Sequence, residues 1–339
     1  MRIAAVAAVA LAGLAQGVAH AFTQAQDGES FKGKTITITV GATPGGGYDA
    51  YGRLVARHIG KHLPGQPVVI ASNMPGGMGI TPANYLYNVA ARDGTAIAIL
   101  VQNLAEEQLL GVDSIQFDAA QFAWVGRIAP NVELAYVWHE VPVTRFEDLQ
   151  QRNTIFAGQG ASAFIYPTLL NKLLDTRIKL VRGYRSTASV HLAMERGEVE
   201  GTTGSLDVMS NLAPDWLRDR KVNILLQYQH ERHPRFADVP TVLEFIQSAD
   251  DRAVFSFFIS SALVGRSIVA PPGLPPERLA LLRRAFDDTM KDPQFLAEAA
   301  QMKFELGPLP GVALQAIVER QISVSPAIRD RILALGWRQ

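Results

Sequence analysis

Apolar and polar positions follow two alternating periods along this chain. Residues 34–40 alternate isoleucine or valine with threonine, the period of two that is typical of a strand. Residues 48–62 instead place apolar side chains at helical spacing, and Pro64 with Gly65 predicts the end of that helix. A buried strand at 68–71, a helix at 80–91 and another buried strand at 95–101 are predicted next. This order predicts an α/β domain with a largely parallel sheet.

The rest of the chain repeats this alternation. Strands are predicted at 134–138, 154–157, 179–181 and 222–228, and helices at 162–174, 187–196, 277–291, from Pro293 onward and over most of 317–335. An apolar run at 255–264 is long enough to cross between two domains. With about 150 residues per domain as a guide, the length also indicates about two domains.

The N-terminus has the pattern of an export signal. Arg2 precedes an apolar run at 3–14, and Ala19-His20-Ala21 is a cleavage sequence of the small-x-small type. The run is shorter than the roughly 20 residues that a membrane-spanning helix needs. We therefore expect residues 1–21 to be a signal peptide, cleaved after Ala21, and the mature protein to work in the periplasm. An uncleaved N-terminal anchor is the alternative.

Composition narrows the classes of partner and chemistry. Lysine plus arginine number 32 and aspartate plus glutamate number 32, so the net charge of zero does not favour nucleic acid as a partner. The chain has no cysteine, which excludes disulfides, thiolate metal sites and a cysteine nucleophile. Its apolar content of 48% is ordinary for a globular protein that folds on its own core.

Two glycine-rich loops each stand between a predicted strand and a predicted helix. Residues 43–49 read T-P-G-G-G-Y-D, and residues 73–79 read N-M-P-G-G-M-G. Glycine leaves backbone N–H groups unobstructed at a helix start, where the helix dipole favours negative charge. Two such loops on neighbouring strands predict a cleft that holds a small anion. The alternative is that the glycines only permit tight turns with positive φ.

Asp49 has two possible roles in the first loop. It precedes Arg53 by four residues, so the two side chains are placed to form an ion pair on one helix face, near the favourable end of the dipole. Asp49 could equally face the cleft and accept a hydrogen bond from a ligand or an ordered water. The sequence leaves both roles open.

Polar residues before later helices are candidates for the opposite side of the cleft. Gln159 and Ser162 can donate amide and hydroxyl hydrogens, although Ser162 could instead cap its helix. Arg185 can hold a carboxylate through two parallel hydrogen bonds, or be a solvated surface residue. Asp207 is either a cleft residue or the cap of the next helix. Further candidates lie at Tyr184, Ser186 and Thr187.

Motifs for enzymatic chemistry are missing from the sequence. There is no G-x-S-x-G nucleophile elbow, and neither glycine loop fits G-x-G-x-x-G or a P-loop. His58 and His62 have a spacing that can bind zinc, but no third ligand is evident and Lys61 lies between them. We therefore expect no enzyme activity, no metal site and no cofactor.

Five motifs in order resemble those of one known family. They are the loop at 44–49 with Arg53, the loop at 73–79, R-D-G-T at 92–95, the pair Y-R-S-T at 184–187 and E-R-G-E-V at 195–199, and A-P-P-G-L-P at 270–275. Together they resemble the substrate-binding receptors of tripartite tricarboxylate transporters, the Bug or TctC-type proteins, over essentially the whole mature chain. Three features depart from the family pattern: residues 157–166 lack the family's histidine, residues 76–79 read G-G-M-G in place of the commoner G-A-G-G, and Arg185 takes the place of a usual proline or lysine.

The resemblance implies a type II periplasmic-binding-protein fold, with two α/β lobes joined by crossing strands and the ligand cleft between them. It places the crossings near 128–133 and 255–264, one lobe at 30–128 and 258–339, and the other at 129–257. The ligand-binding residues expected from the resemblance and the loops are Thr43, Gly45, Gly46, Gly47, Tyr48, Asp49, Asn73, Gly76, Gly77, Met78, Gln159, Gly160, Ala161, Ser162, Tyr184, Arg185, Thr187 and Asp207.

The expected function is capture of a small carboxylate-bearing metabolite and its delivery to the membrane subunits of a secondary transporter, by a protein that is a monomer. Two alternatives remain open at this point. The protein could present its ligand to a membrane sensor kinase, or it could be an exported enzyme on the same fold, which the missing motifs disfavour.

Overall fold

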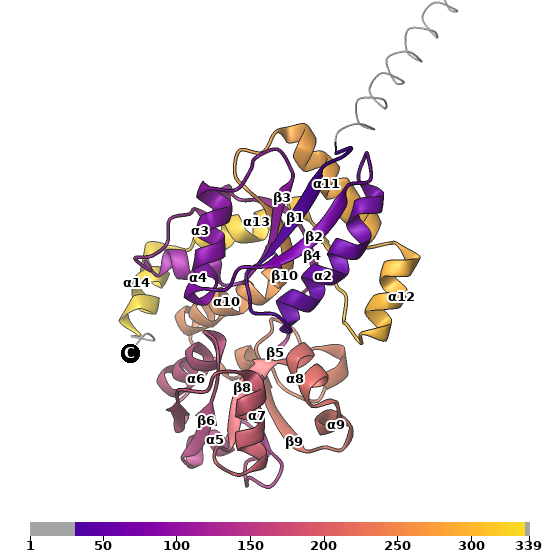
Figure 1. The fold of residues 1–339 in the computed structure, drawn as a ribbon. Helices are drawn as coiled ribbons and strands as arrows, with labels where there is room; N and C mark the ends of the chain where they lie inside the picture. Colours follow the sequence, from indigo (N-terminus) through magenta and orange to yellow (C-terminus); the bar gives the residue numbers. More distant parts are fainter. Residues whose placement is uncertain (1–30, 336–339) are drawn as a thin grey trace, which may run out of the picture.

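Two lobes, each built on its own β-sheet, make up the computed structural model, which describes residues 31–335 (Figure 1). The predicted signal peptide and its cleavage after Ala21 lie outside these residues. Within 31–335, none of the helices has the length and apolar character needed to cross a bilayer.

The first lobe contains a six-stranded sheet. Its order is β11 (Leu309–Pro310), β4 (Ala123–Ala129), β10 (Arg266–Ala270), β3 (Ala96–Leu100), β1 (Thr35–Val40) and β2 (Val68–Asn73). The strands β1, β2 and β3 are parallel, as predicted, whereas β10 runs antiparallel to both of its neighbours. The prediction that 68–71 is buried is wrong, because β2 is an edge strand: Val68 is 64% exposed and Ile70 46%.

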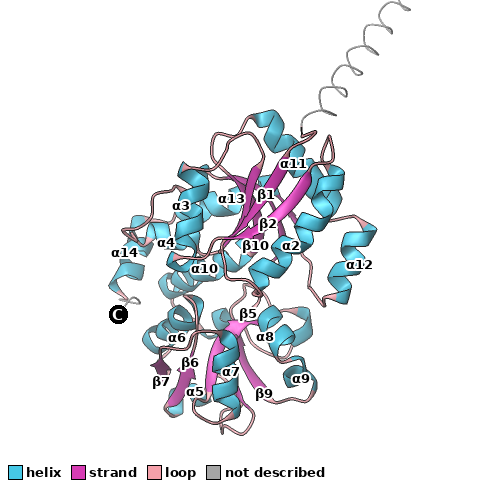
Figure 2. Ribbon diagram, in the orientation of Figure 1, coloured by secondary structure: helices cyan, strands magenta, loops and turns pink. Residues whose placement is uncertain are grey.

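Helices cover both faces of this sheet (Figure 2). One face packs against α2 (Gly47–Ile59), α11 (Pro276–Thr289) and α12 (Pro293–Gln301); the other packs against α3 (Ile80–Asn88), α4 (Leu104–Leu109) and α13 (Gly311–Ile322). The helical pattern predicted at 317–335 is broken in two, since Ser325 caps a new helix, α14 (Pro326–Ala334), with proline at its first position.

The second lobe contains a five-stranded mixed sheet. Its order is β7 (Ile178–Val181), β6 (Thr154–Ala157), β8 (Gly201–Ser205), β5 (Glu133–Trp138) and β9 (Val222–Gln227). The helices of this lobe are α5 (Asp148–Gln151), α6 (Ser162–Leu173), α7 (Thr187–Glu195), α8 (Leu206–Leu212) and α9 (Pro214–Arg218). Short 3₁₀ helices in the two lobes are η1 (Gly60–His62), η2 (Gly77–Gly79), η3 (Ala119–Gln121), η4 (Pro234–Phe236) and η5 (Val242–Phe245).

The chain passes between the lobes twice. The first crossing is the short segment 130–132 between β4 and β5, within the predicted 128–133. The second is the helix α10 (Ala249–Val264), so the apolar run at 255–264 forms a helix and not the expected crossing strand. Its phenylalanines join the core of the second lobe, while α13 and α14 of the C-terminal region pack on it. The boundary near 257 therefore stays a prediction.

Candidate functional site

The two glycine-rich loops lie side by side at one end of the first sheet. The side-chain amide of Asn73, in the second loop, donates to the carbonyl of Ala42 at 3.0 Å and to Asp49 Oδ1 at 2.9 Å. In the first loop, Gly45 has a φ of 82° and its N–H donates to Asp49 Oδ2 at 2.9 Å. The two loops are thus fastened to each other, and the residues at their tips stay exposed.

Asp49 makes the contacts of a structural residue. Besides Gly45 and Asn73, it accepts from Arg53 Nε at 2.9 Å, the ion pair four residues apart that its spacing predicted. Burial acts to raise the pKa of this carboxyl, but the hydrogen bonds and charge of these partners outweigh it and hold the pKa below its usual value. An ionised Asp49 therefore fixes the shape of both loops, whether or not a ligand also reaches it.

The helices that follow two of the predicted loops begin without a side-chain cap. The residue before α2 is Gly46 and the residue before α6 is Ala161, and neither offers an acceptor to the first helical turn. Among the other described helices, a side chain caps α7, α10, α12 and α14, and none caps α3, α4, α5, α8, α9, α11 or α13. Since the first amides of a helix have no acceptor within it, α2 and α6 keep N–H groups available for an anion.

A buried arginine joins the two lobes beside the first loop. Arg266, the first residue of β10, donates from Nη2 to Asp207 Oδ2 at 2.9 Å, and Asp207 lies in the first turn of α8 in the other lobe. The guanidinium lies over the ring of Tyr48, 4.3 Å from its centre, an arrangement of the cation–π type. A Cβ placed on Gly47 would be 3.3 Å from Arg266 Nη2, so the loop approaches this ion pair closely.

A buried carboxyl group of the second lobe lies near the Arg266–Asp207 ion pair, the place where the lobes meet and which we call the junction. Glu133, the first residue of β5, accepts from Asn131 Nδ2 at 2.7 Å and from Ser162 Oγ at 3.4 Å, both at Oε1. Burial raises the pKa of Glu133 to about 7, against the opposing effect of Arg266. Ser162 thus serves this carboxyl group and does not cap α6.

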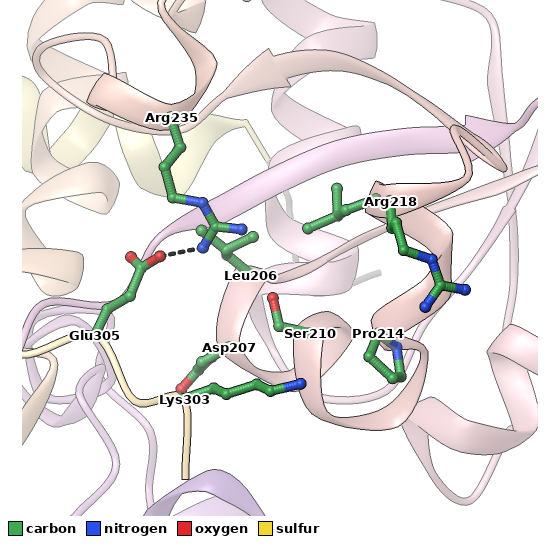
Figure 3. Close-up of a pocket in the computed structure, with 9 residues that line it drawn as sticks. Leu206, Asp207, Ser210, Pro214, Arg218, Arg235, Lys303 and Glu305 are labelled. Atoms are coloured by element: carbon green, nitrogen blue, oxygen red, sulfur yellow. Dashed lines mark hydrogen bonds and ion pairs between the residues drawn. The ribbon is translucent and has the colours of Figure 1, made fainter. Parts of the chain in front are cut away.

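A pocket of about 400 Å³ lies between the lobes, with Asp207 in its wall (Figure 3). Its walls come from the second lobe at Leu206, Asp207, Ser210, Pro214, Leu217, Arg218 and Arg235, and from the first lobe at Lys303 and Glu305. Figure 3 shows Arg235 and Glu305 paired across the space between the lobes. Of the residues predicted from the sequence, Asp207 is the one among those lining this pocket.

Most of the other predicted binding residues lie at exposed positions and make no contact with the Arg266–Asp207 pair among the described contacts. Gln159, Gly160 and Arg185 are exposed on the second lobe, and Tyr184 packs against the core of that lobe. In the second loop, Gly76, Gly77 and Met78 are exposed and all have positive φ, so this turn needs the backbone freedom that glycine provides. The cap before Thr187 is Ser186, within a capping box. A binding role for each of these residues stays a prediction.

The sequence did not predict four buried residues at and around the junction. Arg266 and Glu133 lie at the ends of apolar strands, Asn131 lies in the crossing segment, and Gln102 follows β3. Each is isolated in the sequence and belongs to no motif. A charged residue at the end of an apolar run, as at Glu133, was the one signal available, because a charge is rarely buried without a function or a partner.

His58, in α2, and His62, in η1, contact the helix α12 and its cap residue. His58 Nε2 lies 2.7 Å from Glu298 Oε2, and His62 Nε2 lies 2.8 Å from Asp292 Oδ2. Each histidine therefore has its own carboxylate partner in the segment 292–301, and no cluster of metal-ligating side chains is found among residues 31–335.

Comparison with solved structures defines the class of fold. The chain superposes on a TctC solute-binding protein from Polaromonas with a TM-score of 0.66 and 19% identity, over 90% of this chain and 98% of that one. For the periplasmic binding protein BugD, the TM-score is 0.65 and the identity 18%, over 89% of this chain and 97% of that one. For Rpa4515 of R. palustris, solved with adipate, the TM-score is 0.66 and the identity 20%, over 89% of this chain and 96% of that one. The fold is therefore the two-lobed fold of periplasmic binding proteins.

Sequence comparison points in the same direction. No family model matches the chain. A UPF0065 protein of Bordetella bronchiseptica is 22% identical over 302 residues, which cover 83% of each chain. A UPF0065 protein of Pseudomonas sp. strain P51 is 26% identical over 249 residues, 69% of this chain and 70% of the relative. Together with the fold, these matches confirm the resemblance to the Bug and TctC-type solute-binding proteins that the motifs predicted.

Proposed function

We propose that this protein is a periplasmic receptor that captures a small carboxylate-bearing metabolite between its lobes and delivers it to the membrane subunits of a tripartite tricarboxylate-type transporter. The observation that carries the proposal is the meeting of the uncapped N-terminus of α2 with the buried guanidinium of Arg266. Backbone amides at a helix start and an arginine are both donors suited to a carboxylate.

The location of this meeting point supports a receptor. Arg266 and Asp207 belong to different lobes, and the crossing segment 130–132 lies next to them through Asn131, which accepts from Arg266 at 3.4 Å. A ligand that contacts both lobes here stabilises the closed arrangement by its difference in affinity between closed and open forms. The solved structure of Rpa4515 contains adipate, a dicarboxylate, and this agrees with the proposal.

Thermal denaturation of the chain from Phe22 onward, in the presence of dicarboxylates, tricarboxylates, aromatic acids and amino acids, tests the proposal. A true ligand present at a hundredfold excess over its Kd should stabilise the protein by about 2.7 kcal/mol. Stabilisation only by solutes without a carboxylate would contradict the proposal.

A paired substitution in the first loop gives a sharper test. Gly47→Val places methyl groups against Arg266 and Asp207, and we expect ligand affinity to fall by about tenfold or more, as expected for the loss of one or two hydrogen bonds. Gly46→Val is the comparison at the neighbouring position, where an added Cβ meets nothing closer than the carbonyl of Thr43 at 3.7 Å and does not reach Arg266. Titration calorimetry measures both variants against the wild type, and wild-type affinity in Gly47→Val would exclude Gly47 from the ligand contact.

A further inference from the structure

One exposed edge of the second lobe carries an excess of positive charge. Residues 172–185 contain five basic side chains and a single acidic one, in a chain whose net charge is zero. The five basic residues, which we call the basic strip, are all exposed: Lys172, Arg177, Lys179, Arg182 and Arg185. So unequal a charge in one short segment creates a local positive potential even though the whole chain is neutral.

No carboxylate within residues 31–335 forms an ion pair with the basic strip. Arg177 donates from Nη1 to a backbone carbonyl at 3.3 Å, and the guanidinium of Arg182 lies over an aromatic ring, 4.3 Å from its centre. Elsewhere in the same lobe, Arg152, Arg218 and Arg232 each pair with a carboxylate. The charge of the basic strip is therefore not neutralised within the described chain.

The basic strip follows the open edge of the second sheet. Its strand β7 pairs with β6 on one side and, within the described chain, has no strand on the other (Figure 2). Lys172 lies in the last turn of α6, and Arg182 lies over Phe164 in the first turn of the same helix. Since α6 packs on β7, the cations extend along the edge from one end of this helix to the other. Side chains alternate between the two faces of a strand, so a surface that approaches the open edge meets cations from both faces.

The composition of the basic strip fits lipid head groups better than a protein partner. Protein interfaces centre on packed aromatic side chains and are poor in lysine. Between 172 and 185, the one aromatic residue, Tyr184, packs against the core of the second lobe, and the one exposed large apolar side chain is Val181. Long cationic side chains without a fixed partner can adapt to a fluid layer of anionic phosphates.

We propose that the basic strip binds the surface of a membrane that contains anionic phospholipid, by electrostatic attraction to the phosphate head groups. Val181 is only 37% exposed, so the apolar contribution is small and the binding is reversible and sensitive to salt. The basic strip lies outside the walls of the pocket between the lobes, so a protein held in this way keeps that pocket accessible. Membrane binding of this kind does not depend on which ligand the protein takes.

Co-sedimentation of the chain from Phe22 onward with lipid vesicles tests the proposal. Phosphatidylcholine vesicles with about 30% phosphatidylglycerol should bind the wild-type protein, and vesicles of phosphatidylcholine alone should not. Each basic residue near an anionic surface strengthens binding about fivefold, so Lys172→Gln with Lys179→Gln should weaken it about twenty-fivefold. The control, Lys291→Gln with Arg329→Gln, removes the same charge at exposed positions outside the basic strip and should bind as the wild type does.

Salt gives a readout that needs no variant. Raising the salt from about 0.1 M to about 1 M shortens the Debye length from about 10 Å to about 3 Å, and vesicle binding should be lost. Absence of binding to the anionic vesicles, equal losses in the two double variants, or binding that survives high salt would each overturn the proposal. Binding to soluble poly-L-glutamate without binding to vesicles would also overturn it, and would assign the basic strip to an acidic protein partner. In every case, stabilisation of the protein by carboxylates separately tests the proposed function.

Discussion

Single residues at the junction carry the electrostatics of the site. Arg266 is buried, and burial acts to lower the pKa of its guanidinium, but the neighbouring Asp207 carboxylate outweighs this and raises it. The cation is therefore permanent. Glu133 is the group whose charge can change near neutral pH, because burial and the remaining acids work against its ionisation. The site thus has a permanent cation, Arg266, and a titrating acid, Glu133, and both side chains hydrogen-bond to Asn131.

Stability should depend on pH through Glu133. Its pKa rises from 4.5 to about 7 on folding, so its contribution is complete below about pH 4.5 and is lost as the pH rises through 7. Glu133→Gln removes this loss, and relative to wild type it should gain roughly 3 kcal/mol between acid and alkaline pH. Urea unfolding of the ligand-free protein at several pH values measures the difference. A constant difference across pH, with Glu140→Gln as control, would contradict the assignment.

At the scale of elements, the alternation of strands and helices could be read from the sequence, and its exceptions have physical causes. The strands β1, β3, β6 and β7 fall where their apolar patterns predicted them. The central strand β8 reads G-T-T-G-S and has too few apolar residues to signal a strand. Glycine suits it because a Cβ at Gly201 would lie 2.6 Å from Phe156 and 2.7 Å from the carbonyl of Tyr136.

The link between α10 and β10 depends on one glycine. Gly265 has a φ of 52° and a ψ of −133°, and a Cβ there would lie 2.2 Å from the carbonyl of Ala129, the last residue of β4 before the other crossing. Gly265→Ala should therefore destabilise the fold by about 2–4 kcal/mol. Gly111→Ala is the control: its φ is 66°, but no atom lies within 4 Å of the added Cβ, so the cost should be only about 1 kcal/mol. Denaturant unfolding distinguishes the two, and equal costs would show that the close approach is unimportant.

For the whole molecule, the relation between the lobes is set by a few polar contacts around the crossings. Arg266 with Asp207 joins them at the floor. Nearer the surface, Glu305 of the first lobe pairs with Arg235 of the second and lies 3.3 Å from His233 Nε2. Arg235 and Glu305 are well exposed, so their ion pair contributes no more than about 1 kcal/mol, whereas His233 is half-buried. Weak contacts at the rim and a buried pair at the hinge are suited to lobes that open and close.

Removing Glu305 should shift this balance toward the open form. In Glu305→Ala, we expect a larger radius of gyration without ligand and an affinity reduced about two- to fivefold, as expected for losing up to 1 kcal/mol of closed-state contact. Small-angle scattering and calorimetry measure the two effects. Glu198→Ala is the control, because Glu198 pairs with Arg196, at 3.9 Å, inside one lobe. An unchanged radius in Glu305→Ala would mean that this pair does not hold the lobes together.

The sequence by itself determined the elements with a regular apolar pattern, the two glycine-rich loops and the resemblance to a family, because apolar periodicity and glycine positions act over a few neighbouring residues. Only the tertiary structure decided that α10 crosses as a helix, that β2 lies at an edge, and that Arg266 and Glu133 meet Asp207. Those three residues stand far apart in the sequence, and only the pairing of strands from separate segments brings their charges together.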